Sequence, residues 1–439
     1  MPDGLVKAIP FEDLIAAARA RSQDGWRADL NDQAKARYHV AGWPHARTES
    51  WKYTNLNALA GSDFTLAEGG AATGAAVPED AILAIDAPRI VLVNGVLDPA
   101  LSNLDALPGG VVLTRLAEAG ESDRAVMASL LSEESSTDGL PLAALNAATL
   151  SDALILDIAT GAVPETAVHV ISVGAGENKA FAPRLLIRAG EDSFADVIES
   201  HVGGGAEVYF SNSVTQVTVA KGARLGHYRL QNEALGAFHV ALTTAEVAEG
   251  AVYDNFVLSL GARLARNEIR GEITGARVEY RINGAYMASG TRHLDNTTFI
   301  DHAAAGSRSR EVYKGVLADA SRGVFQGKIL VRQDAQQTDG YQMNRAMLMS
   351  DRAEIDSKPE LEIYADDVRC SHGATVGELE EDHLFYLQAR GIDRDTARRL
   401  LVSAYIDEAI DEIHSEPVRE AMKQRASDWL AQNLSGDGA

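Results

Sequence analysis

Apolar residues recur at helical spacing near the start of the chain. Phe11, Leu14, Ile15 and Ala18 fall at i, i+3, i+4 and i+7, which is one face of an amphipathic helix. Residues 42–56 (GWPHARTESWKYTNL) hold two Trp and a Tyr, a pattern typical of a packed anchor, with a docking patch for a partner as the alternative. Residues 64–80 are rich in Gly and Ala and predict a linker. We therefore expect an N-terminal helical region over residues 1–85.

The pattern changes at RIVLVNGVL (89–97), a strand run interrupted by an Asn-Gly turn. Further along, β-rich runs are divided by glycines at regular intervals. A helical crossover between parallel strands needs a dozen or more residues, and these intervals leave no room for one. The repeat therefore favours a β-solenoid with a thin aliphatic core, and an antiparallel sandwich is the alternative. The glycines that mark the repeat are Gly190, Gly205, Gly222, Gly250, Gly261, Gly275, Gly290, Gly306 and Gly323.

The helical pattern returns after Val376. Glu380–Arg390 is amphipathic, and Gly391 supplies a C-terminal stop. Asp393 can cap the next helix, and a final helix follows Pro417. These boundaries give a β core over residues 86–376 and a C-terminal helical domain over 377–439.

The composition excludes several classes of function. The formal charge of −23 makes the chain a poor candidate for binding nucleic acid or an anionic membrane. The single cysteine, Cys370, excludes an internal disulfide and a self-contained zinc or iron–sulfur site, and it favours a reducing compartment. The N-terminus has no basic segment followed by an apolar core, and no run of about 18 apolar residues occurs. We therefore expect a cytoplasmic protein.

The segment PELEIYADDVRCSHGATVG (359–377) carries the most informative chemistry. On a strand, Cys370 and His372 project from one face, about 7 Å apart. Thiolate plus imidazole suits iron, zinc or copper, but two ligands cannot close a tetrahedral site. A metal here would need further ligands from elsewhere in the chain or from a second chain. The alternative is a cysteine that packs as a small apolar residue beside a surface histidine.

The same alternation extends backward if the strand is unbroken. It would then place Asp366, Tyr364 and Glu362 on the face of Cys370, with Gly373 turning the chain beyond His372. Nucleophilic catalysis by Cys370 with His372 is disfavoured, because side chains two apart on a strand do not reach hydrogen-bond distance.

Other motifs predict no catalytic residue. GVFQGKI (323–329) lacks the G-x-x-x-x-G-K-[ST] spacing of a phosphate loop. His293, Asp301 and His302 lie in the β region, and we expect them to be solvated turn residues.

Two long stretches carry a family resemblance. They are residues 307–392, which include KPELEIYADDVRCSHGATVG and LFYLQARGI, and ESWKYTNL near the N-terminus. Both resemble the SufB/SufD family of iron–sulfur cluster assembly proteins, and weaker likeness covers most of the chain. The CSHG and WKYT motifs are closer to the SufD branch. The SufB branch carries more cysteines, including the one taken to receive sulfur.

The resemblance implies a right-handed parallel β-helix core flanked by N-terminal and C-terminal α-helical regions. It implies a non-catalytic scaffold subunit of a SufBCD complex, paired with SufB through the β-helices. The ATPase SufC would dock on the C-terminal helices, about 379–435, and would supply ATP hydrolysis. His372 and Cys370 map onto the interface residues that bind iron or nascent cluster together with SufB.

Two properties of the isolated chain follow from this reading. We expect it to bind no cofactor stably, because iron or cluster would be held only transiently and in the complex. An exposed β-helix edge favours pairing, so a homodimer is expected in the absence of SufB. Two competing hypotheses remain open: a metal-dependent or carbohydrate-acting β-helix enzyme, and a purely structural partner in which Cys370 and His372 only pack.

Overall fold

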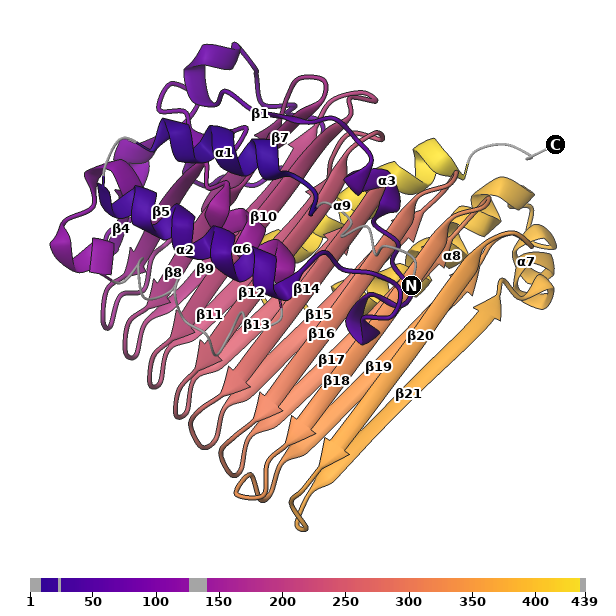
Figure 1. Ribbon diagram of the computed structural model, residues 1–439. Helices are drawn as coiled ribbons and strands as arrows, with labels where there is room; N and C mark the ends of the chain where they lie inside the picture. Colours follow the sequence, from indigo (N-terminus) through magenta and orange to yellow (C-terminus); the bar gives the residue numbers. More distant parts are fainter. Residues whose placement is uncertain (1–8, 23–24, 126–139, 435–439) are drawn as a thin grey trace, which may run out of the picture.

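Two stacks of parallel strands face one another in this computed structural model, which describes residues 9–22, 25–125 and 140–434 (Figure 1). The chain alternates between the stacks, so one strand from each makes a turn of a β-helix. Within the described residues there are eight such turns, from β5 and β6 to β20 and β21. The first sheet contains β4 (Val111–Arg115), β5 (Asp152–Ile158), β8 (Pro183–Ala189), β10 (Tyr209–Val219), β12 (Phe238–Val247), β14 (Leu264–Ile273), β16 (His293–His302), β18 (Arg322–Val331) and β20 (Glu354–Ile363). The second contains β2 (Arg89–Val93), β3 (Val96–Leu97), β6 (Val168–Gly174), β9 (Phe194–Gly203), β11 (Arg224–Asn232), β13 (Val252–Ser259), β15 (Glu279–Ala288), β17 (Arg308–Leu317), β19 (Asp339–Leu348) and β21 (Arg369–Glu378).

The strand register confirms a parallel β-helix and excludes the antiparallel sandwich. Successive turns pair residues 26 to 32 positions apart, as in Phe238 with Leu264 and Arg322 with Glu354. Antiparallel pairing among the described residues is confined to β2 with β3 and β4 with β5. Two glycine-spaced units therefore make one turn. Each unit supplies one strand.

The repeated glycines mostly lie in the short connections between strands. Glycine is needed there for two physical reasons. Gly222 has φ +69°, a left-handed conformation that other residues adopt at a cost. Gly261 passes so close to the turn before it that a Cβ would lie 2.4 Å from the Glu233 backbone nitrogen. Gly323 differs, because it lies inside β18 and not in a turn.

The Asn-Gly turn predicted in RIVLVNGVL joins β2 to β3. Asn94 and Gly95 both have positive φ, 49° and 75°. That combination gives the tight hairpin turn that Asn-Gly favours.

The N-terminal helices cover the first sheet (Figure 1). Leu14, Ile15 and Tyr38 pack in one buried cluster with Phe210 and Phe238 of β10 and β12. The helices that precede β5 are α1 (Glu12–Arg21), α2 (Gly25–Ala41), the short η1 (Glu49–Trp51), α3 (Asn57–Ala60), η2 (Gly70–Thr73), η3 (Leu104–Ala106), η4 (Leu116–Glu118) and α6 (Pro141–Ala148). The last three lie within residues 86–376, the range predicted for the β core.

The linker predicted for residues 64–80 is wrong. β1 (Thr65–Leu66) pairs in parallel with β7 (Lys179–Phe181), and Ala67 is buried in a cluster with Phe181. Small residues are needed here because the segment lies against the β-helix. A Cβ on Gly69 would lie 2.5 Å from the Val96 side chain.

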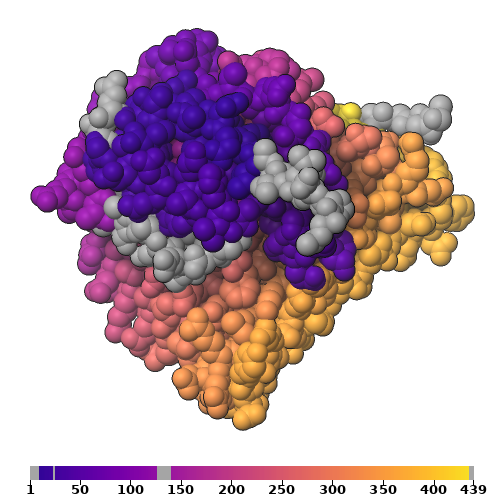
Figure 2. Space-filling view, in the orientation of Figure 1, coloured from indigo at the N-terminus to yellow at the C-terminus, as the bar shows by residue number. Residues whose placement is uncertain are grey.

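The C-terminal helices α7 (Glu381–Gln388), α8 (Arg394–Ile410) and α9 (Glu416–Asn433) follow the last turn, and α8 and α9 cover the second sheet. Val402, Ile406 and Trp429 share a buried cluster with Tyr228 and Phe256 of β11 and β13. The sequence signals for these helices are confirmed. Gly391 has φ +89° after α7, and the Asp393 carboxylate accepts a hydrogen bond from Thr396 N to cap α8. The last turns of the β-helix, in orange, extend beyond the indigo N-terminal helices (Figure 2).

Candidate metal-binding edge of the β-helix

The β-helix ends in an open turn. In the described chain, β20 pairs only with β18 and β21 only with β19, so one edge of each strand has no neighbouring strand. Large apolar side chains are exposed on these strands and just after β20: Ile363 is 38% exposed, Tyr364 60% and Val376 54%. Unpaired edges with exposed apolar side chains are typical of a surface that pairs with another chain.

Cys370 lies on this last turn with its thiol directed inward. The sulfur lies 3.3 Å from the position that a Cβ would take on Gly340, so the missing side chain makes room for it. The thiol packs on the interior cluster and is half-buried. Burial raises the pKa of Cys370. Because the thiolate is both the nucleophile and the metal ligand, the isolated site favours the unreactive protonated form.

His372 follows two residues later on the same strand and is exposed. The predicted strand geometry therefore holds, since both side chains project from one face of β21. The condition of an unbroken strand fails. The chain turns between Ile363 and Arg369, so Glu362, Tyr364 and Asp366 do not continue that face. Gly373 is also not a turn residue, because it lies within β21 paired with Met343.

Cys370 and His372 do not by themselves make a metal site. Among residues 9–22, 25–125 and 140–434, no group of three or more His, Cys, Asp or Glu side chains is arranged to hold a metal ion. Iron or a cluster bound at Cys370 and His372 would be a cargo, and it would need ligands from outside this part of the chain.

Buried polar side chains lie in the turns beneath the pair. Ser309 precedes Gly340 and Cys370 in one column of register positions, and its hydroxyl lies 2.8 Å from His302 Nε2. Glu311 precedes Gln342 and His372 in the next column, and Gln342 Nε2 donates to Glu311 at 2.7 Å.

The prediction that His293, Asp301 and His302 are solvated turn residues is wrong. All three lie on β16; His302 is fully buried and Asp301 is 8% exposed. Burial lowers the pKa of His302 to about 4, so its ring is neutral at physiological pH. Asp301 binds Arg332 at 2.7 Å, and His293 lies 2.9 Å from the Thr54 hydroxyl.

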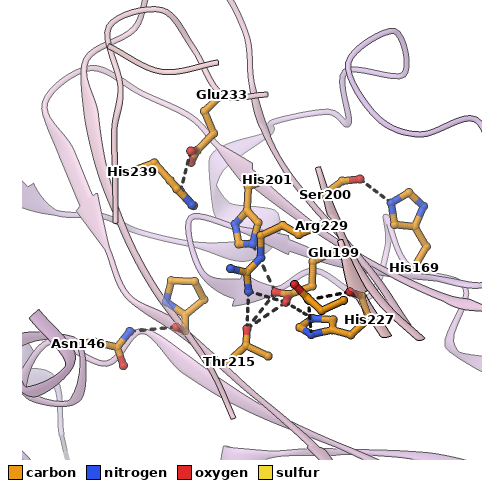
Figure 3. A network of polar contacts seen from close by, with 12 residues as sticks. Asn146, His169, Glu199, Ser200, His201, Thr215, His227, Arg229, Glu233 and His239 are labelled. Atoms are coloured by element: carbon orange, nitrogen blue, oxygen red, sulfur yellow. Dashed lines mark hydrogen bonds and ion pairs between the residues drawn. The ribbon is translucent and has the colours of Figure 1, made fainter. Parts of the chain in front are cut away.

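A second interior network lies several turns away, where Arg229, His227 and Thr215 converge on Glu199 (Figure 3). Arg229 and His227 each lie 2.7 Å from the Glu199 carboxylate, and Thr215 donates from the opposite sheet at 3.1 Å. Burial would raise the pKa of Glu199, but the charge of Arg229 and the hydrogen bonds from His201 and His227 hold it well below its usual range. The buried ion pair lies within the second sheet, and the Thr215 hydroxyl of the first sheet links the two sheets by its hydrogen bonds to Glu199 and Arg229.

Sequence reasoning missed this network and the polar column under His372. Charged residues on a strand usually face solvent, and a one-residue shift of register would turn them outward. The alternation of Glu199 and His201 with Ile198 and Val202 gave no signal either, because it predicts that the apolar side chains face inward. In the structure Ile198 packs against the C-terminal helices, and Glu199 and His201 are buried.

The motif WKYT has a structural role that confirms the predicted packed anchor. Trp51 is 4% exposed, and its ring lies 4.0 Å from the guanidinium carbon of Arg266. Thr54 donates a hydrogen bond to Asp295. Both contacts join the N-terminal region to β14 and β16.

None of the helices in the described parts of the chain is both long enough and apolar enough to cross a membrane.

The fold is a parallel β-helix covered by helices on both sheets, and its last described turn is open and carries Cys370 and His372. Two family models cover most of the sequence. The "SUF system FeS cluster assembly, SufBD core domain" matches residues 171–405, and the "SufBD protein N-terminal region" matches residues 11–170. The chain therefore belongs to the SufB/SufD family of iron–sulfur cluster assembly proteins.

Curated relatives align with this chain over nearly its whole length. The chain is 32% identical to the iron–sulfur cluster assembly protein SufD of Escherichia coli, over 90% of each chain. It is 28% identical to a SufBD family protein of Synechocystis, over 88% of this chain and 87% of the relative. A SufBD family protein of Mycobacterium tuberculosis is 30% identical over 86% and 87%. The family predicted from the CSHG and WKYT segments is confirmed.

Proposed function

We propose that this chain is the SufD-like, non-catalytic subunit of a cytoplasmic SufBCD-type complex. It pairs with a SufB-like chain through the open end of the β-helix and presents His372 and Cys370 to iron or a nascent cluster. The observation that carries the proposal is the position of this incomplete ligand pair on the last, unpaired turn. The partner's side chains complete the ligand set, and the isolated chain retains no cluster.

The edge itself supports pairing with another β-helix. The backbone groups on the free side of β20 and β21 can continue the parallel ladder into a second chain. Exposed Ile363, Tyr364 and Val376 supply apolar area for the same contact. Without a SufB-like chain, a second copy can use these groups, which gives a homodimer.

The C-terminal helices support docking of an ATPase of the SufC type. Phe385 and Tyr386 on α7 are 73% and 57% exposed, and Leu400 on α8 is 50% exposed. The helices also carry exposed acidic and basic side chains such as Glu381 and Arg394, which pair at 2.8 Å. Aromatic anchors within a polar rim are typical of a protein interface.

The test is to tag the chain in its native host, purify it anaerobically at modest salt, and identify the proteins that co-elute. Recovery of a cysteine-richer paralogue together with a P-loop ATPase supports the proposal. Repeated recovery of the chain without them contradicts it. If the complex forms but keeps its iron after both Cys370 and His372 are changed to alanine, the chain is a purely structural partner.

A further inference from the structure

A chain of buried polar contacts leads from the interior toward His372. Thr298 on β16 donates to the Glu311 carboxylate at 2.5 Å, and Gln342 on β19 donates to its other oxygen at 2.7 Å. Glu311 and Gln342 are both fully buried. The side-chain nitrogen of Gln342 is thus committed to the interior, which sets the orientation of its amide.

The oxygen of the same amide has no hydrogen-bond partner in the described part of the chain. Gln342 Oε1 is buried and has no hydrogen-bond partner among the described residues. A buried acceptor without a partner is costly, so one is expected within reach. The next side chain in the same register position is His372, on the strand that pairs directly with β19. Neighbouring strands lie about 4.8 Å apart, so the His372 ring can reach the amide oxygen by turning about its side-chain torsions. In the conformation that the structure records, the ring does not make this bond and Oε1 has no partner within the described residues.

We propose that Gln342 is a positioning residue for His372. When the ring turns toward the interior, Gln342 Oε1 accepts a hydrogen bond from one ring nitrogen of His372, which fixes the tautomer and leaves the other nitrogen free to face the partner chain. Histidines that bind metals commonly donate their second N–H to an oxygen in this way. The biological purpose of this contact depends on the proposed ligand role of His372. The contact itself does not depend on that role.

The same strand provides a matched control. Asn344 also faces the interior and is fully buried, but both ends of its amide are occupied. Its oxygen accepts from the Tyr286 hydroxyl at 3.1 Å, and its nitrogen donates to Ser357 at 2.9 Å. Its register neighbour on β21 is Ala374, so it has no histidine to orient.

The experiment uses the full chain labelled with ¹⁵N at histidine, without iron and without a partner. The ring nitrogens of His372 are assigned with His372→Gln and read at a pH where the ring is neutral. Gln342→Leu should shift the ratio of the two His372 tautomers about fivefold, the effect expected for losing one hydrogen bond. Asn344→Leu should leave the ratio unchanged.

An unchanged tautomer ratio in folded Gln342→Leu overturns the proposal, as does an equal change in Asn344→Leu. If Gln342→Leu does not fold, Gln342→Met removes the acceptor with less change of shape and is read in the same way. Because the readout needs neither iron nor SufB, a failure of the ligand role leaves this result standing. Conversely, an unchanged ratio leaves the ligand role of His372 to be tested by cluster formation.

Discussion

Arg266 of β14 stacks on Trp51 of the N-terminal region, with the guanidinium carbon 4.0 Å from the ring centroid. The two ends of the same guanidinium bind Asp295 at 2.5 Å and Glu268 at 2.9 Å. Arg266 is completely buried, so both its charge and its flat face are satisfied by neighbours. One residue of the β-helix thereby anchors a segment that precedes the first strand of the helix.

Replacing Trp51 with alanine should therefore loosen the N-terminal region. The change removes a buried aromatic ring and leaves one face of Arg266 uncovered, so we expect a loss of about 3–5 kcal/mol in the free energy of unfolding. Denaturant titration followed by circular dichroism measures it. Lys52→Ala, at an exposed neighbouring position, should change the free energy by less than about 0.5 kcal/mol. Equal effects of the two substitutions would show that the stack contributes nothing.

Glu311 should make the stability of the chain depend on pH. Burial raises the pKa of its carboxyl from 4.5 to about 7, against the lowering effect of its hydrogen bonds to Thr298 and Gln342. Between these two values the unfolded chain has lost a proton that the folded chain keeps. The free energy of unfolding therefore falls as pH rises from about 4.5 to about 7 and then levels off, by roughly 3 kcal/mol in total for this group.

Glu311→Gln removes the titration. Its contribution to the pH slope should disappear, and above neutral pH the variant should be more stable than the parent chain. The substituted amide can still accept from Thr298, and its nitrogen can donate to Gln342 Oε1 once the Gln342 amide turns over, because in the parent chain Gln342 Nε2 faces Glu311. Glu360→Gln, on the half-exposed surface of β20, should preserve the slope of the parent chain. A parent-like slope in Glu311→Gln would place the pH dependence elsewhere.

The exposed aromatic side chains of α7 lead to a prediction about the ATPase. Phe385→Asp places a charge in the proposed interface, and it should weaken association with the SufC-type partner at least about tenfold. The side chain is 73% exposed, so the fold should be unaffected. Val40→Asp on α2 is the control, because Val40 is 90% exposed but lies in the N-terminal region. Affinity measured with purified partner decides the matter, and a normal value for Phe385→Asp would exclude this docking surface.

The sequence predicted the β-helix because its turns are marked locally, by glycines such as Gly222 and Gly250 that adopt positive φ. It also predicted the ends of the last helices, because caps such as Asp393 act within one turn. It could not predict the linker region correctly, since Gly69 and Ala67 are small for the sake of close packing and not for mobility.

The sequence predicted only the part of the candidate site that lies on one strand. Cys370 and His372 are two residues apart, so their shared face follows from the period of a strand. Gln342 lies 30 residues before His372 and Glu311 lies 31 before Gln342, and only the register between turns brings them into one column. That register varies from turn to turn and leaves no local trace in the sequence.

The most direct test of the account is cluster formation by the assembled complex after His372→Ala. The complex is purified anaerobically, its subunit ratio is measured, and the iron and sulfide that it acquires are quantified. We predict normal assembly with a clearly reduced cluster yield, while His45→Ala, an exposed histidine of the N-terminal region, leaves both unchanged. Normal assembly with an undiminished cluster yield in His372→Ala would contradict the claim that this edge of the β-helix supplies a ligand.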